Sequence, residues 1–161
     1  MDVVILLSAM TFEPRSLTLT YKRMVGDDVV KEHINFKRIE RSMNPLRQHH
    51  GRAIQFFLSL KRLLRGDDIP VLLLLLITFF SPDRPCLESR SKVEETRERY
   101  LCILQMYLNS RFPPEESRLL FPKLLTKLVE VAELGVIGHE ANKQADKEGI
   151  NPLFRELFSI E

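Results

Sequence analysis

The uncharged run at residues 71–80 (VLLLLLITFF) constrains the fold more than any other part of the chain. It is about half as long as the roughly 20 residues that a membrane crossing needs. Aspartates also stand on both sides of it, at Asp68 and Asp83. A helix that is apolar all round is typical of a protein core. The run therefore predicts a wholly buried core helix, with Pro70 in its first turn and a proline-containing turn at 81–85 closing it.

The composition fits one globular domain with its own core. The chain has 161 residues, of which 44% are hydrophobic and 29% are charged. Two cysteines, Cys86 and Cys102, are too few for a disulfide framework or a four-cysteine zinc site, so we expect both to be buried and reduced. The N-terminus has an acidic second residue and an apolar run broken by Ser8, which is unlike a signal peptide. We expect the protein to stay inside the cell.

Apolar side chains that recur every three or four residues predict most of the remaining structure to be helical. Residues 17–22 instead alternate with period two, which predicts one strand of a small β-hairpin. Residues 28–36 are expected to form a short helical stretch, and 140–149 a mobile polar segment. The fold class is therefore all-α with one hairpin. The expected helices are 2–10, 53–65, 69–80, 92–109 with Ser91 as cap, and a last one that includes 119–134 and is weakened at Gly135 and Gly138.

The C-terminal residues 151–158 predict a short amphipathic helix. Leu153 pairs with Leu157, and Phe154 with Phe158, at the i, i+4 spacing that brings side chains together on a helix. A helix of two turns is not stable by itself, so it must dock on another surface. On spacing alone, a helix that only caps the core is the favoured interpretation.

Four segments in this order resemble the ligand-binding domain of nuclear receptors, in particular the vitamin D, pregnane X and hormone receptor 96-like group. They read VVILLSAMTFEP, FFSPDRPCLESRSKVEETRERYLCILQMYL, LLFPKLLTKLVEVAELG and PLFRELF. The Ser-Pro-Asp-Arg-Pro turn and the terminal PLFRELF are the most specific of them. The resemblance implies a partial, layered helical sandwich over residues 1–161. It implies an N-terminally truncated domain and no zinc-finger DNA-binding domain, which would require eight cysteines.

The same resemblance implies part of a ligand-regulated transcription factor in the nucleus, with no catalytic residues, cofactor or metal. Residues 151–158 would be the activation helix, which recruits LxxLL coactivators through Leu153, Phe154, Glu156 and Leu157. The Glu156 carboxylate would hold the positive N-terminal end of the incoming coactivator helix. The lysine that completes this clamp in the family has no counterpart in this chain.

The resemblance further implies a pocket for a small lipophilic ligand, steroid-like or xenobiotic, and a surface for a retinoid X receptor-like heterodimer partner. Leu7 stands where the family has a ligand-facing arginine, so the pocket would be more apolar. The pocket would be lined by Leu6, Met10, Phe12, His139 and Phe154, although a solvated histidine is the simpler interpretation of His139. The dimer surface would consist of Phe121, Leu124, Leu125, Leu128 and Val131.

Other functions receive less support. A chain without DNA-binding fingers could act only as a heterodimer decoy, or be an inactive fragment; this interaction module is the alternative. Residues 22–65 carry 11 Lys or Arg against 4 Asp or Glu, but they lack an interleaved aromatic platform, so no direct DNA contact is expected. No membrane partner is expected either. The pair His49 and His50 suits a polar loop better than a metal site. No glycine-rich phosphate loop, H-E-x-x-H or G-x-S-x-G motif indicates an enzyme.

Overall fold

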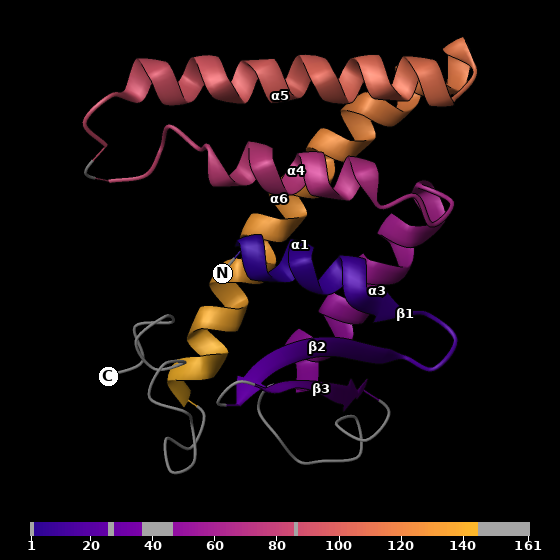
Figure 1. Cartoon of the computed structure of the whole chain (residues 1–161), viewed down its shortest axis with the longest axis vertical. Helices are drawn as coiled ribbons and strands as arrows, with labels where there is room; N and C mark the ends of the chain where they lie inside the picture. The colour runs from indigo at the N-terminus through magenta and orange to yellow at the C-terminus, as the bar shows by residue number, and fades with distance from the viewer. Residues whose placement is uncertain (1, 26–27, 37–46, 86, 145–161) are drawn as a thin grey trace.

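The computed structural model of the chain describes residues 2–25, 28–36, 47–85 and 87–144. Five helices and three strands are found in these ranges (Figure 1). The predicted fold class, all-α with a small hairpin, is confirmed. In chain order the elements are α1 (Asp2–Thr11), β1 (Phe12–Glu13), β2 (Thr18–Val25), β3 (Asp28–Asn35), α3 (Arg47–Leu63), α4 (Ile69–Phe79), α5 (Arg90–Arg111) and α6 (Pro114–Gln144).

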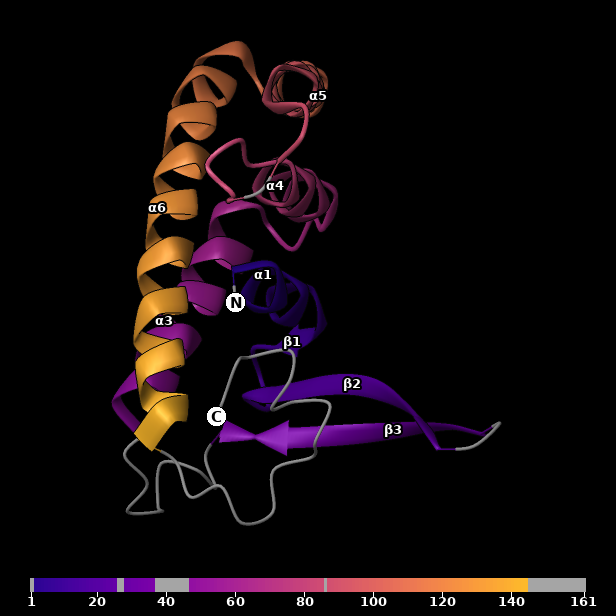
Figure 2. The same cartoon turned by 90° about the vertical axis from the view of Figure 1, so that its left-hand side faces the viewer.

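The helices form two layers. In Figure 2, α6 runs the length of the molecule with α3 beside its lower half, while α5, α4, α1 and the sheet are stacked one below another on the other side. Each of α1, α3, α4 and α5 packs against α6. Within the stack, α4 lies between α5 and α1. The long helix α6 therefore serves as the common support of the described fold.

The sheet contains one strand more than the sequence predicts. Its order is β1-β2-β3, with both pairs antiparallel, and β2 and β3 form the expected hairpin. The helical stretch expected at 28–36 is wrong, because these residues pair with β2 from Thr18↔Asn35 to Val25↔Asp28. Val29 and Val30 are β-branched and favour a strand once a partner strand is available.

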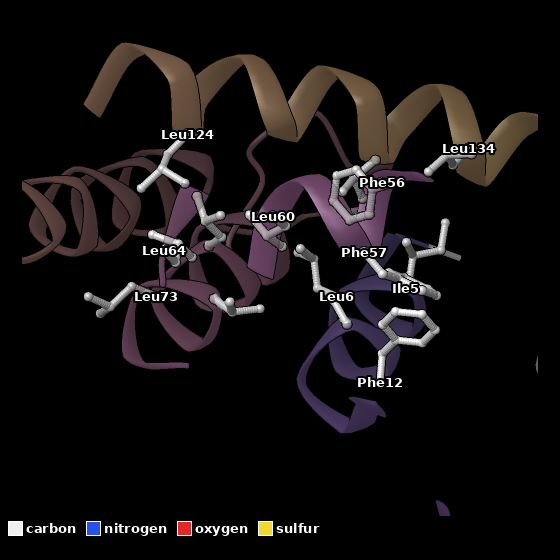
Figure 3. Close-up of a cluster of buried hydrophobic side chains, with 14 of the residues drawn as sticks. Ile5, Leu6, Phe12, Phe56, Phe57, Leu60, Leu64, Leu73, Leu124 and Leu134 are labelled. Atoms are coloured by element: carbon white, nitrogen blue, oxygen red, sulfur yellow. The ribbon is translucent and has the colours of Figure 1, made fainter. Parts of the chain in front are cut away.

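A single apolar core lies between the layers. Leu6 of α1, Leu60 of α3 and Leu124 of α6 are fully buried, and Figure 3 shows them among the side chains of the same cluster. The apolar residues that predicted α3 from their spacing are indeed its buried ones. They are Ala53, Ile54, Phe57 and Leu60, and Phe56 and the next residue after the helix, Leu64, are also buried.

Helix α4 is only partly buried, so the expectation of a wholly buried helix is wrong. Leu74 and Ile77 are fully buried, but Ile69, Leu72 and Phe79 are 49%, 44% and 55% exposed. In Figure 2, α5 lies above the helix, α1 lies below it and α6 lies to its left, so the side of α4 that faces away from α6 has no neighbouring helix among the described residues. A run of uniformly apolar residues carries no periodicity, so the sequence could not show which face lies outward. Among the described residues, no helix has both the length and the hydropathy for a membrane span.

Several helix ends lie within a few residues of the positions expected from the sequence. After α3, Arg65 and Gly66 adopt left-handed φ angles of 52° and 81°, as is common where a helix stops. Helix α5 begins at Arg90, with Ser89 rather than Ser91 as N-cap. Helix α6 begins at Pro114, where a proline is tolerated because the first turn of a helix has no partner for its backbone N–H.

The end of α6 and one cysteine differ from expectation. Helix α6 continues through Gly135 and Gly138, which are both buried, so packing offsets the roughly 1 kcal/mol that each glycine costs a helix. Residues 140–144 of the predicted mobile segment are thus helical, and 145–149 lie outside the described residues. Cys102 is exposed rather than buried because it lies on the outer face of α5. Cys86 lies outside the described residues.

Candidate ligand and partner sites

Three of the expected ligand-contact residues come together at the junction of α1 and β1, where they form part of the core. Leu6 and Phe12 are 0% and 3% exposed, and Met10 is half-buried. The Phe12 ring packs against the rings of Phe36 and Phe57, with centroids 6.1 Å and 5.2 Å away. These two rings were missed by sequence reasoning, because they come from distant segments. The side chains of Phe36 and Phe57 thus pack closely around Phe12 in the core.

The remaining expected site residues are placed as follows. His139 is half-buried near the C-terminal end of α6. Phe154, and with it the whole expected coactivator set of Leu153, Phe154, Glu156 and Leu157, lies outside the described residues.

The five expected dimer residues do not form one exposed seam. Leu124 and Val131 are 0% and 1% exposed, and they are therefore core residues that a partner cannot reach. The heptad-like stripe of α6 to which they belong instead packs against the four other helices of the described fold. Phe121, Leu125 and Leu128 are half-buried. The large apolar side chains of α6 that are well exposed are Leu119, Val129 and Val136.

Leu125 and Leu128 line a surface cavity of about 1020 Å³, which we call the α4–α6 groove. The start of α1, the end of α4, the middle of α5 and α6 all contribute to it, and its apolar residues include Ile77, Leu101 and Val129. Arg97 of α5 also lines it. The Arg97 Nε atom is buried, with no hydrogen-bond partner among the described residues. Arg97 stands among charged residues in the sequence, so its neighbours along the chain do not indicate that part of its side chain is buried.

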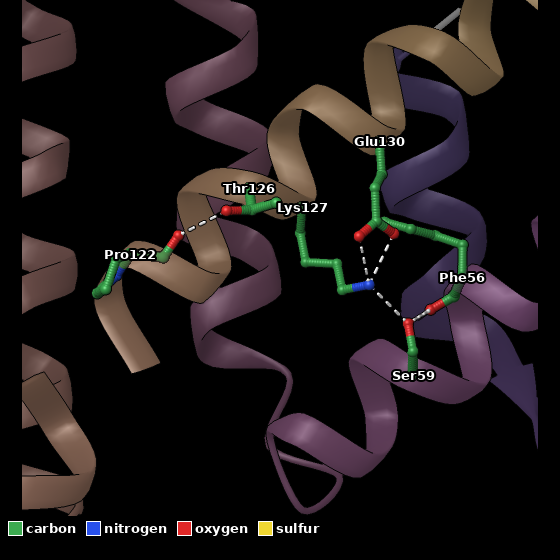
Figure 4. Close-up of polar contacts among 6 residues, drawn as sticks. All are labelled: Phe56, Ser59, Pro122, Thr126, Lys127 and Glu130. Atoms are coloured by element: carbon green, nitrogen blue, oxygen red, sulfur yellow. Dashed lines mark hydrogen bonds and ion pairs between the residues drawn. The ribbon is translucent and has the colours of Figure 1, made fainter. Parts of the chain in front are cut away.

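Lys127 joins the two helices of one layer. Its ammonium group on α6 donates to the Ser59 hydroxyl on α3 at 2.9 Å and to the two Glu130 carboxylate oxygens at 2.6 Å and 2.8 Å (Figure 4). It also lies 5.6 Å from the centroid of the Phe56 ring, within the range of a cation–π interaction. Arg52 and other residues beside this junction line a second cavity of about 490 Å³. The spacing of Lys127 and Glu130 along one helix is visible in the sequence. The contact of Lys127 with Ser59, which lies 68 residues away in the chain, is not.

Asp67 holds the α3–α4 turn to α5. One carboxylate oxygen accepts a hydrogen bond from the Ile69 backbone N–H at 3.0 Å, and the other accepts one from the Tyr107 hydroxyl at 2.8 Å. The Arg111 guanidinium lies 3.8 Å from the second oxygen. The hydrogen bond to Asp67 raises the pKa of Tyr107 above its ordinary value, and burial and the Asp67 charge act in the same direction while Arg111 opposes them.

This raised pKa predicts a loss of stability at high pH. The folded protein holds the Tyr107 proton more tightly than the unfolded chain does, so the stabilisation is complete below the ordinary pKa of 10.0 and is lost as the pH rises through the raised value. We expect the free energy of unfolding, measured in urea, to fall above about pH 10, and Tyr107→Phe to reduce this fall. Tyr100→Phe serves as the control, and an equal effect of both variants would contradict the prediction.

The chain is similar in sequence to Vitamin D3 receptors from several species. No protein-family model matches it. It is 40% identical to the Vitamin D3 receptor of Gallus gallus over 116 residues, which covers 67% of this chain and 25% of that receptor. The receptor of Xenopus laevis is 33% identical over 143 residues, covering 84% and 30%. That of Saguinus oedipus is 32% identical over 173 residues, covering 99% and 37%. The chain thus spans about a quarter to just over a third of the length of these relatives.

Proposed function

Because the chain belongs to the nuclear receptor family, as part of the ligand-binding domain, we propose that it forms the ligand-binding, dimerisation and coactivator-recruiting part of a ligand-regulated transcription factor in the nucleus. The observation that carries this proposal is the similarity to Vitamin D3 receptors along most of the chain. The layered helices and the hairpin support it, because they occur where the resemblance to the family expects them.

Coactivator recruitment is assigned to residues 151–158. Leu153, Phe154 and Leu157 would offer an apolar surface to an LxxLL helix, and Glu156 would accept hydrogen bonds from the free N–H groups at the N-terminal end of that helix. The motif PLFRELF supports this assignment, since it provides the apolar residues and the carboxylate at the required spacing.

We expect Glu156→Lys to weaken the binding of an LxxLL peptide about tenfold or more, because it replaces an attraction to the helix N-terminus by a repulsion. Fluorescence anisotropy with a labelled peptide measures this, with and without candidate lipophilic ligands such as vitamin D3, which the relatives' name indicates. Glu161→Lys makes the same charge change five residues later and is the matched control. Unchanged affinity in Glu156→Lys would refute the assignment.

A small lipophilic ligand, steroid-like or xenobiotic, is the proposed regulator. Leu6, Met10 and Phe12 remain the proposed contact residues on α1 and β1, with His139 and Phe154 from the C-terminal part of the chain. Since Phe36 and Phe57 already pack against Phe12, ligand entry would require these rings to move.

Dimerisation with a retinoid X receptor-like partner is proposed for α6. Its exposed Leu119 and half-buried Phe121 are the residues that a partner can reach near the start of the helix. The alternative is a heterodimer decoy, and the closed packing around Leu6 and Phe12 favours it, because that region holds side chains where the ligand is expected. Co-purification of the retinoid X receptor-like partner, together with no binding of an LxxLL peptide under any ligand condition, would show that the chain acts as a heterodimer decoy.

A further inference from the structure

The α4–α6 groove is a cavity that has no role in the proposed function. Its volume of about 1020 Å³ compares with roughly 300–1,000 Å³ for the pockets that hold small molecules. Its apolar lining comes from three helices, with Ile77 on α4, Leu101 on α5, and Leu125 and Leu128 on α6. None of the described residues expected to contact the regulatory ligand lines it. The groove is therefore a separate candidate binding site.

Arg97 brings a cation into this apolar groove. The residue is half-buried, its Nε atom is covered, and no hydrogen bond or ion pair joins its guanidinium to another described residue. A partly desolvated cation without a counter-ion is unfavourable. A planar guanidinium also matches a carboxylate, because the two groups form parallel hydrogen bonds. The groove thus favours a ligand that carries a carboxylate.

The other charged groups of the groove limit the ligand to a single acidic group. Asp2 and Asp83 also line it, and they would repel a second carboxylate. Arg84 lines it as well, but this side chain has partners of its own. It donates to the Thr78 carbonyl at 3.5 Å, and its guanidinium lies 5.8 Å from the centroid of the Phe79 ring. Arg97 is therefore the cation that is available to a ligand.

The remainder of the ligand must suit a lining of leucine, isoleucine and valine side chains. These side chains offer no hydrogen-bond partner, so a peptide would bring backbone N–H and C=O groups that the apolar lining cannot satisfy. An alkyl chain has no polar group, and each methylene that it buries is favourable. One carboxylate on a long alkyl chain therefore fits both parts of the groove.

We propose that the α4–α6 groove binds a long-chain fatty carboxylate, with the carboxylate on Arg97 and the alkyl chain against the leucine side chains of α5 and α6. The ligand would contact α1, α4, α5 and α6 together, so its binding would stabilise the packing of these helices against one another. The inference goes beyond the proposed function and does not depend on it.

A fluorescent fatty acid tests the proposal with the full chain. The probe is cis-parinaric acid, a long-chain polyene carboxylate whose fluorescence rises in an apolar environment, and we expect it to bind saturably. Palmitic acid should displace the probe. Hexadecanol has the same alkyl chain without the carboxylate, and it should displace the probe about tenfold more weakly, because it cannot form the charged hydrogen bonds to Arg97.

Two pairs of variants locate the probe. Arg97→Gln should weaken its binding about tenfold, whereas Arg99→Gln should leave it unchanged, because Arg99 is an exposed residue of the same helix that pairs with Glu95. Val129→Glu places a carboxylate in the groove and should also weaken binding about tenfold or more. Val136→Glu is its matched control, since both valines lie on α6 and are 59% and 60% exposed, but Val136 does not line the groove.

Circular dichroism checks that each variant folds, and the Val129→Glu and Val136→Glu pair decides the question if Arg97→Gln does not fold. The proposal is overturned if the probe shows no saturable binding, or if hexadecanol displaces it as well as palmitic acid does. It is also overturned if Val129→Glu weakens binding no more than Val136→Glu does. Failure of LxxLL-peptide binding would affect only the proposed function, because that assignment uses residues outside the groove.

Discussion

Replacing Leu60 by alanine is expected to lower the free energy of unfolding by about 2–5 kcal/mol, the range for a buried leucine whose cavity does not collapse. Leu60 is 0% exposed. It lies on α3 in the same cluster as Leu6 of α1 and Leu124 of α6 (Figure 3). Its removal therefore leaves a cavity in the core to which α1, α3 and α6 all contribute. Urea unfolding followed by circular dichroism measures the change.

Leu119→Ala is the matched control. It makes the same leucine-to-alanine change on α6, at a position that is 61% exposed. Substitutions at such surface positions change stability by about 0.5 kcal/mol or less. Similar losses in the two variants would show that the core does not lie between the layers as described.

The second large effect is expected at Asp67. Asp67→Ala removes the acceptor of the Ile69 N–H and of the Tyr107 hydroxyl, and it removes the carboxylate near Arg111. The side chain of Asp67 is only 17% exposed. Hydrogen bonds to a charged group contribute about 1.5–3 kcal/mol, so we expect a loss of about 2–3 kcal/mol in urea unfolding at neutral pH.

Two further variants separate the contributions at Asp67. Asp67→Asn keeps an acceptor oxygen for one partner and should cost less than Asp67→Ala. In a double-mutant cycle, Tyr107→Phe should cost much less in the Asp67→Ala background than in the natural protein, because its partner is already gone. Additive losses would mean that the 2.8 Å contact between the two side chains does not stabilise the fold.

Helices were predicted well where apolar and polar residues alternate with a clear period. The buried residues of α3 are those that its spacing indicates, and the start of α6 at Pro114 follows from the proline and acidic residues there. Strand β3 was missed because the sequence of 28–36 fits either a short helix or a strand. Pairing with β2 decides between them, and pairing is not a local property.

The candidate sites were harder to predict. The resemblance to the family assigns roles along α1 and α6, but it does not show that Leu124 and Val131 face inward or that Leu125 and Leu128 line a groove. Nor could sequence reasoning show that the Nε atom of Arg97 is buried, because Arg97 stands among charged residues along its helix. Each of these properties depends on a second helix that is distant in the chain.

The sequence by itself determined the family, the helical character and the order of the elements, because motifs, periodicity and capping residues act over a few neighbouring positions. Only the tertiary structure decided which face of α4 is open, which rings surround Phe12, and which residues bind Lys127 and Asp67. The reason is physical: burial and hydrogen bonding are set by the neighbours that a side chain meets in space, and in this protein α1 and α6, which lie at opposite ends of the described chain, pack against each other.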